Sequence, residues 1–416
     1  MRWRAAHIHI VLVSIWMALF GVAPGFPAPL IDFDASGRLR LESRWHPQSG
    51  TFPEQSGHAS GLVAEPEFHL EDTRGRSLTL TPFFRYDSAD PRRTHFDLRE
   101  AYLLLFGQGG SGEWELRLGV DRVFWGVAES RHLVDIVNQT DLIEHPDEEE
   151  KLGQPMAHLT WSADWGVVEV FGLPYHRTRT FPGPGGRLRY SLAVDTDNPL
   201  YESRANQWHF DVAARYSHSF GPLDIGASVF DGTSREPFLQ PDLNSGGVPV
   251  LRPYYEQIRQ LGLDAQLTLG AWLLKLETIQ RSGARNLRGV KQNYGAMVSG
   301  FEYTFYSVWG SAHDISLLGE WNYDGRGGNA TNFFDNDVFV AARWAPNDVQ
   351  GTELLAGIMF DATRSSQVVT LEFNRRITDR WSLSVESIAF PRVDESDILH
   401  QTRRDSFLSF SVIYNF

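Results

Sequence analysis

The sequence contains no cysteine among its 416 residues. Disulfide bonds, thiolate metal sites and cysteine nucleophiles are therefore excluded, and the composition suits a protein that crosses an oxidising compartment unfolded. An excess of basic residues is also missing, because the formal net charge at pH 7 is −14. Nucleic-acid phosphates bind to basic surfaces, so this charge argues against a nucleic-acid partner.

Long apolar runs are missing as well, apart from one near the N-terminus. Residues 8–20 form an apolar run that follows two arginines and precedes several small residues. This order predicts a signal peptide over residues 1–25, with cleavage between Ala23 and Ala28, although a buried N-terminal helix is an alternative. No later stretch approaches the roughly 18 consecutive apolar residues of a membrane-spanning helix. We therefore expect no membrane helix after processing.

The mature chain, residues 26–416, shows a period of two from Ile31 onward. In one such run, Trp208, Phe210, Val212 and Tyr216 alternate with more polar residues, which is typical of a strand with two unlike faces. The runs predict an all-β fold, a transmembrane antiparallel up-and-down β-barrel of about 18 strands, with 16 as the alternative. The predicted strands are 31–45, 61–71, 76–87, 96–106, 113–124, 155–162, 166–173, 207–218, 222–230, 258–269, 272–281, 294–306, 313–323, 336–344, 352–361, 367–377, 380–389 and 405–416.

The links between the predicted strands alternate in length. Short links near 163–165, 219–222 and 270–271 alternate with long ones such as 125–154 and 174–206. Outer-membrane barrels have short periplasmic turns and longer extracellular loops, so this alternation favours such a barrel. Aromatic residues gather at the short links, as in the girdle at a membrane interface: Trp161, Trp165, Phe220, Trp272, Trp309, Trp344 and Trp381.

The last strand carries a further signal. Leu408, Phe410, Val412, Tyr414 and Phe416 alternate, and the last of them ends the sequence. This pattern resembles the C-terminal signal that the barrel-assembly machinery reads in outer-membrane proteins. Phe410, Val412, Tyr414 and Phe416 are therefore the predicted insertion signal, with an ordinary final strand as the alternative.

A closed wall of 18 strands has a bore too wide for side chains to fill, so a channel or an inward-folded loop is expected. No plug domain is expected before the first strand. Leu133, Ile136 and Val137 recur at helical spacing in the segment 122–150, which predicts a short amphipathic helix with an Arg131–Asp135 ion pair. The alternative is a loop above the mouth. The candidate pore constriction comprises Arg122, Glu129, Arg131, His132, Asp135, Asn138 and Asp141.

Charged residues alternate with the apolar rows and are predicted to face the lumen. Opposed charges would create a transverse field that admits small polar solutes, or they would bridge neighbouring strands and stiffen the wall. The acidic run 147–150 could bind divalent cations, but a solvated loop is the favoured interpretation. The candidate lumen wall comprises Arg85, Glu115, Arg117, Asp121, Asp211, Arg215, Glu320, Arg343, Glu353 and Glu372.

One segment also carries a family resemblance. The run Arg122-Val123-Phe124-Trp125-Gly126, followed by Val134-Asp135-Ile136-Val137-Asn138 and Asp141, resembles an uncharacterised porin-like family of Gram-negative outer membranes. Gln139 stands where that family favours proline. A more distant similarity is to the 18-stranded alginate-export barrels, whose strongly basic lumen is not evident here. The resemblance implies a porin-like barrel.

The favoured function is passive diffusion of small hydrophilic solutes through an outer-membrane channel. An export or hydrophobic-substrate conduit with periplasmic partners is the second hypothesis, and an enzyme or structural barrel is less favoured. Ser217 and His218 are sequence neighbours on opposite faces of one strand, so they do not form a nucleophile–base pair. No catalytic, cofactor or metal site is predicted. The expected partners are outer-membrane lipid, lipopolysaccharide, the barrel-assembly machinery and small polar solutes, with a homotrimer as a possible assembly.

Overall fold

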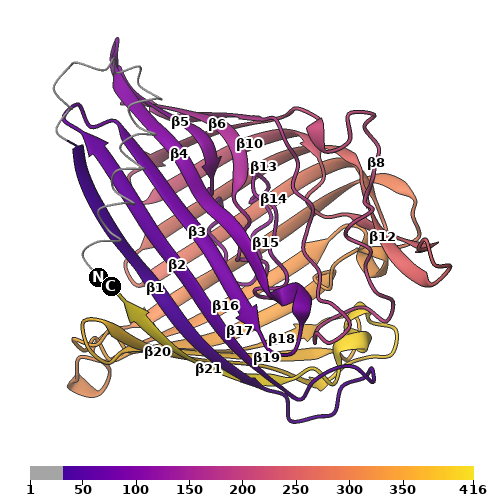
Figure 1. Ribbon diagram of the computed structural model, residues 1–416. Helices are drawn as coiled ribbons and strands as arrows, with labels where there is room; N and C mark the ends of the chain where they lie inside the picture. Colours follow the sequence, from indigo (N-terminus) through magenta and orange to yellow (C-terminus); the bar gives the residue numbers. More distant parts are fainter. Residues whose placement is uncertain (1–30) are drawn as a thin grey trace, which may run out of the picture.

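A computed structural model describes residues 31–416, and the predicted signal peptide lies outside these residues. The described chain forms a tilted antiparallel β-barrel (Figure 1). Its 18 strands confirm the predicted fold class and exclude the 16-stranded alternative. They are β1 (Ile31–Trp45), β2 (His58–Asp72), β3 (Ser77–Asp87), β4 (His95–Gly109), β5 (Gly112–Asp121), β6 (Gln154–Ala163), β7 (Gly166–Leu173), β9 (Asp211–Phe220), β10 (Leu223–Thr233), β13 (Gln257–Leu269), β14 (Trp272–Arg285), β15 (Lys291–Phe305), β16 (Asp314–Asp324), β17 (Asn336–Ala345), β18 (Glu353–Asp361), β19 (Gln367–Arg376), β20 (Trp381–Arg392) and β21 (Phe407–Asn415).

The first and last strands close the barrel. β1 pairs antiparallel with β21, from Arg38 opposite Asn415 to Trp45 opposite Leu408. Along β21, Leu408, Phe410 and Val412 are exposed, whereas the residues between them are buried. The same alternation recurs around the wall, so the exposed apolar rows form the outer face and the residues between them face the interior. Among residues 31–416, no helix has the length and apolar character needed to cross a membrane.

The longest strand links all lie at one end of the barrel. Gly221 and Gly270 stand in two-residue links with φ values of 62° and 61°, a left-handed conformation that glycine adopts without steric cost. The long links 46–57, 122–153, 174–210, 234–256, 325–335 and 393–406 are all at the other end. Both described ends of the barrel sequence lie on the short-turn side (Figure 1).

A small second sheet was missed by the periodicity. β11 (Phe238–Leu243) and β12 (Pro249–Tyr255) form a hairpin, and β8 (Leu200–Tyr201) pairs in parallel with β12. Pro241, Pro249 and Pro253 obscure the strand pattern in these segments. The remaining elements are short 3₁₀ turns: η1 (Pro91–Arg93), η2 (Asn206–Trp208), η3 (Val308–Gly310), η4 (Gly327–Asn329) and η5 (Ile398–Thr402).

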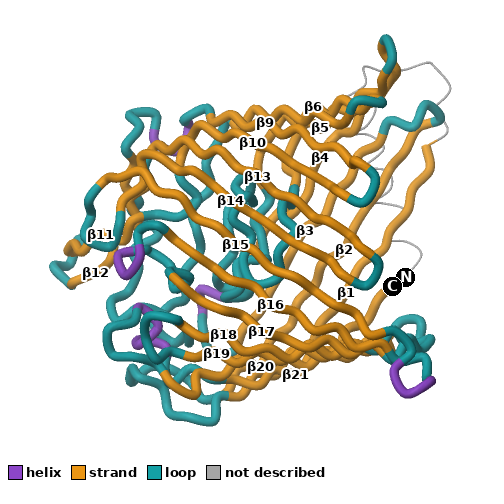
Figure 2. The backbone as a smooth tube through the Cα atoms, turned by 180° about the vertical axis from the view of Figure 1, so that it is seen from behind, coloured by secondary structure: helices purple, strands orange, loops and turns teal. Residues whose placement is uncertain are grey.

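The link between β5 and β6, residues 122–153, folds into the barrel, and we call it the inward loop. Loop segments run through the interior between opposite strands (Figure 2). The predicted amphipathic helix is wrong, because residues 122–153, all of them described, contain no helix. The predicted Arg131–Asp135 pair is wrong too. Arg131 lies 3.9 Å from Asp324, and Asp135 lies 3.1 Å from Lys151.

Candidate functional site

One wall carboxylate anchors the first half of the inward loop. Glu277 on β14 accepts hydrogen bonds from the backbone N–H groups of Val127, Ala128, Leu133 and Val134, at 2.7 to 3.3 Å. These amides donate to the wall instead of to carbonyls four residues earlier, which explains why helical spacing does not yield a helix. Glu277 is fully buried. Hydrogen bonds to a charged group are the strong ones, so this anchor fixes the loop across the bore.

A second wall carboxylate holds the neighbouring residues. Glu320 on β16 accepts from the backbone N–H groups of Glu129 and Ser130 at 2.8 Å and from the Ser130 hydroxyl at 2.6 Å. The Glu129 carboxylate in turn lies 2.7 Å from Arg343 and 3.7 Å from Lys275. Charge-assisted contacts therefore join the loop to three strands, β14, β16 and β17.

The side of the loop that faces β6 to β15 is dry. Its apolar side chains pack on inward-facing apolar residues of the wall in one continuous cluster. We call this cluster the dry half of the lumen. The ring of Trp125 lies 5.5 Å from that of Phe171 in an edge-on arrangement, with both side chains buried. The cluster comprises Trp125, Ala128, Leu133, Val134, Ile136 and Val137 of the loop and Met156, Phe171, Leu173, Ala213, Phe230, Ile258, Ile279, Ala284, Tyr294, Ala296 and Val298.

The opposite side of the loop meets a network of buried ion pairs. Arg85 on β3 lies 2.6 Å from Glu144 of the loop and 3.3 Å from Glu42 on β1. Arg93 lies 2.9 Å from the same Glu42 and 2.8 Å from Asp87. Each of these groups is at most 8% exposed, so removing one partner would leave an uncompensated buried charge. The network fixes the loop to β1 and β3.

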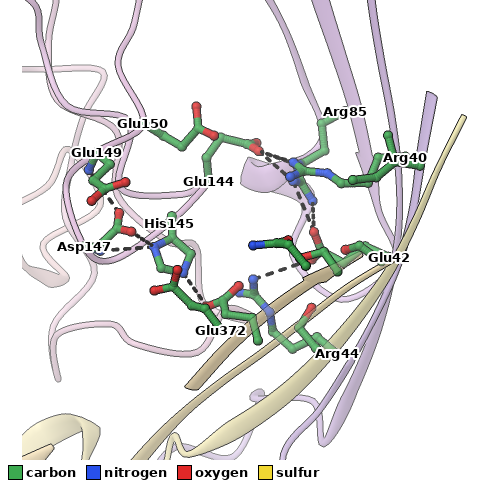
Figure 3. Close-up of a pocket in the computed structure, with 16 residues that line it drawn as sticks. Arg40, Glu42, Arg44, Arg85, Glu144, His145, Asp147, Glu149, Glu150 and Glu372 are labelled. Atoms are coloured by element: carbon green, nitrogen blue, oxygen red, sulfur yellow. Dashed lines mark hydrogen bonds and ion pairs between the residues drawn. The ribbon is translucent and has the colours of Figure 1, made fainter. Parts of the chain in front are cut away.

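A polar cavity of about 220 Å³ remains between the second half of the inward loop and the wall (Figure 3). Arg40, Arg44 and Arg85 lie on the β1 and β3 side, where Glu42 and Glu144 contact Arg85. Asp147 and Glu149 of the loop and Glu372 of β19 lie across the cavity from them (Figure 3). Opposed charges of this kind create an electrostatic field across the cavity. We call this region the polar half of the lumen. The cavity is lined by Arg40, Glu42, Arg44, Arg85, Glu144, His145, Asp147, Glu149, Glu150, Glu372, Asn374, Ser384, Glu386, Ser409, Ser411 and Ile413.

Two loop histidines are held in their charged form. Burial alone would lower the pKa of His145, but Asp147 at 2.6 Å and Glu386 outweigh it and raise the pKa to about 10. Burial would also lower the pKa of His132, whereas contacts with Glu149 and Glu277 raise it to about 9. Both imidazolium groups therefore bind loop to wall at neutral pH.

An apolar pocket of about 370 Å³ adjoins the polar cavity near the long-link end. Phe333 and Phe334 from the link 325–335 cover inward-facing Phe339, Leu355 and Met359 of β17 and β18. Asp147, Glu149 and Glu372 line both spaces, so an acidic boundary separates the apolar pocket from the arginine side. A molecule with an apolar body and a polar end fits such a junction.

The seven predicted constriction residues are on the inward loop but do not line the polar cavity, as far as the described residues show. Glu129 lines the apolar pocket. The others make contacts that hold the loop: Arg122 with Glu100 and Glu65, Arg131 with Asp324, His132 with Glu277 and Glu149, Asp135 with Lys151, Asp141 with Arg99, and Asn138 with the carbonyl oxygens of Asp121 and Leu152. A role for them in the field of the pore stays a prediction.

The predicted lumen-wall residues lie on rows opposite the exposed apolar rows. Arg85 and Glu320 contact the inward loop, and Glu372 lines the polar cavity. The others form ion pairs: Arg117 with Glu115 and Asp121, Arg215 with Asp264, Asp211 with Arg235, and Arg343 with Glu129 and Glu353. Three residues of the predicted insertion signal, Phe410, Val412 and Tyr414, pair with β1, and Phe416 follows β21 and exchanges backbone hydrogen bonds with Gly37. Recognition of this signal by the assembly machinery stays a prediction.

Sequence reasoning missed the loop residues that do line the polar cavity. Glu144, His145, Asp147, Glu149 and Glu150 follow the family-like segment, and their acidic run was interpreted as a solvated loop. One feature of the sequence does point to this role: the acidic run directly follows the segment predicted to enter the bore. The arginines of β1 could not be paired with it, because the sequence does not give the distance across the barrel.

No protein-family profile and no curated protein sequence matches the chain. Solved structures with a similar arrangement include in-vitro folded OmpT, an outer membrane protein of Vibrio cholerae in a trimer form. That comparison has 10% identity, a TM-score of 0.47, and coverage of 93% of this chain and 99% of the other. A mutant of the Rh. blastica porin has 10% identity, a TM-score of 0.43, and coverage of 92% and 100%. The fold assignment itself rests on the pairing of β1 with β21.

Proposed function

We propose that this protein is a porin-type channel of a Gram-negative outer membrane, through which small hydrophilic solutes diffuse passively. The observation that carries the proposal is the polar cavity beside the inward loop, with arginines of β1 and β3 on one side and acidic groups on the other. A hydrated passage with opposed charges orients polar solutes and lets them pass without a tight binding site. The outward apolar rows support a lipid environment.

The location follows from the same features. An apolar outer face is stable in lipid, and sorted links are typical of barrels in the outer membrane. We include in the proposal the removal of residues 1–25 as a signal peptide, insertion by the barrel-assembly machinery and contact with lipopolysaccharide. A homotrimer stays a prediction. Chemical cross-linking of the purified protein in detergent would measure the oligomeric state.

The proposal is tested by conductance in planar lipid bilayers. The refolded barrel is expected to insert and give discrete current steps, and liposomes that contain it are expected to swell in small sugars but not in large ones. Folding is verified beforehand by a difference in gel mobility between boiled and unboiled samples. A folded, inserted barrel without current steps and without swelling would contradict the channel.

The apolar pocket favours a second candidate function, a conduit for partly apolar solutes. A passage for fully hydrophilic solutes has no use for Phe339, Leu355 and Met359 on its inner wall. Under this candidate, amphipathic cations would interrupt the current at concentrations where sugars have no effect. Met359→Gln would weaken that block but leave the unblocked conductance intact. Equal effects of both solute classes would leave simple diffusion as the function.

A further inference from the structure

Three side chains converge where the inward loop meets β4. His95 is the first residue of β4, and Asp141 and Glu144 belong to the loop. The Nε2 atom of His95 lies 3.8 Å from Asp141 Oδ2 and 3.9 Å from Glu144 Oε1. One ligand atom of each residue lies within 4.8 Å of the others. Asp141 and Glu144 are 0% and 4% exposed.

The hydrogen bonding of His95 leaves a lone pair facing the two carboxylates. Its Nδ1 atom lies 3.1 Å from the carbonyl oxygen of Arg93, which can only accept, so Nδ1 carries the hydrogen. In the neutral ring Nε2 is then unprotonated. Nε2 and Glu144 Oε1 are both enclosed and have no hydrogen-bond partner among the described residues. Enclosed electron-rich atoms without a partner are costly, and a cation between them would remove that cost.

A proton does not fill this position well. Protonated Nε2 would have to donate over 3.8 or 3.9 Å, which is beyond hydrogen-bond range. A metal ion with bonds of about 2.0–2.2 Å places tetrahedral ligand atoms roughly 3.3–3.5 Å apart. The two separations from Nε2, 3.8 and 3.9 Å, are therefore a few tenths of an ångström longer than an ion requires, and the two carboxylate oxygens lie within 4.8 Å of each other. Small side-chain rotations close this difference.

The surrounding contacts already orient all three groups. Arg99 donates to Asp141 Oδ2 and Thr180 to Asp141 Oδ1, each at 2.7 Å. Arg85 donates to Glu144 Oε2 at 2.8 Å, which leaves Oε1 directed at the cluster. The carbonyl that holds Nδ1 is the partner that metal-binding histidines commonly have. An ionised carboxylate has about four lone-pair sites, so these contacts do not exhaust its capacity.

We propose that His95, Asp141 and Glu144 bind one divalent transition-metal ion of the zinc class. One imidazole nitrogen with two carboxylate oxygens suits zinc, manganese or iron(II) better than calcium or magnesium, which select oxygen ligands. Three protein ligands leave a position for water. The other acidic cluster, formed by Asp335, Asp337 and Asp361, contains no histidine and therefore lacks the imidazole nitrogen that favours an ion of the zinc class.

The ion has a route to the site and an effect on the loop. Glu144 also lines the polar cavity, from which a hydrated ion reaches its Oε1 atom. Once bound, the ion joins β4 of the wall to residues 141 and 144 of the loop. It thus acts as a cross-link beside the passage and limits movement of the loop.

The test measures zinc binding by the untagged, refolded full-length barrel in detergent after treatment with EDTA. Titration calorimetry is expected to give one equivalent for the wild type. His95→Gln and the isosteric Glu144→Gln should each weaken the affinity at least about tenfold. His158→Gln is the matched control, because His158 lies 3.1 Å from the single carboxylate of Glu169 and is expected to leave zinc binding unchanged.

Two results overturn the proposal: a wild-type barrel that binds no zinc, or variants that bind it as tightly as the wild type does. Heat-modifiable gel mobility verifies that each variant is folded. If one variant fails that test, the other variant and the wild-type stoichiometry decide. A second measurement concerns the channel, since EDTA should increase the current noise of the wild type but not that of His95→Gln. Zinc binding is measured without current, so its failure is distinguishable from failure of the channel proposal.

Discussion

The dry half and the polar half of the lumen belong to one wall but contact the inward loop in opposite ways. Along β6 to β15, Phe171, Ala213 and Ala296 turn inward and belong to the apolar cluster that packs on the loop. Along β1 and β19 to β21, most of the residues that border the polar cavity are charged or polar. The loop therefore packs on apolar residues on one side of a wide bore and leaves a polar cavity on the other. The composition of the inner wall, and not the strand count alone, sets the width of the passage.

The largest expected effect comes from breaking the anchors that hold the loop on the dry half. The double variant Glu277→Ala and Glu320→Ala removes the two carboxylates that accept hydrogen bonds from the loop amides. Each buried amide left without a partner costs about 1–3 kcal/mol of folding free energy. We expect the loop to leave the bore and the single-channel conductance to rise about twofold or more. Glu115→Ala is the control, because Glu115 pairs with Arg117 of its own strand. Unchanged conductance in the folded double variant would show that these anchors do not hold the loop.

A smaller effect is expected from changing the charge of the polar half. Glu372 is exposed to the cavity opposite the arginines of β1, and Glu372→Lys replaces an acidic group with a basic one. The potassium-over-chloride permeability ratio should fall about two- to fivefold, as measured by the reversal potential in a salt gradient. Glu67→Lys, on a strand that does not line this cavity, is the control. Equal ratios for wild type and Glu372→Lys would place the passage elsewhere.

The smallest effect concerns the loop contact that depends on pH. The pKa of His145 is raised from 6.5 to about 10 in the folded protein. Its contribution to stability is therefore complete below about pH 6.5 and is lost as the pH rises through about 10. Current noise should increase over that upper range and already be high at neutral pH in His145→Gln. If the current noise does not change with pH up to and beyond this range, His145 does not help to anchor the loop.

The sequence predicted the barrel well because strand alternation is a local pattern. Each of the 18 barrel strands overlaps a predicted run, since one row must face lipid and the other the lumen. The small sheet of β8, β11 and β12 lies in links where proline interrupts the pattern.

The candidate site was less predictable, because its contacts join residues far apart in the sequence. Leu133, Ile136 and Val137 have helical spacing, but Glu277 lies more than one hundred positions away and takes the amides that a helix would need. The metal cluster is hidden for the same reason, since His95 and Asp141 belong to different elements. The spacing of neighbouring residues reveals neither the contact of the loop with Glu277 nor that of His95 with Asp141.

The division of the lumen is tested most directly by cysteine accessibility, which the absence of native cysteine makes possible. Ser384→Cys and Asn374→Cys place a thiol on the polar cavity, and Ala213→Cys and Ala296→Cys place one in the dry half. With a membrane-impermeant, charged thiol reagent, we expect rapid labelling and a change of current for the first pair. The second pair should stay unlabelled until the barrel is unfolded. Equal labelling rates at all four positions in folded barrels would contradict the account.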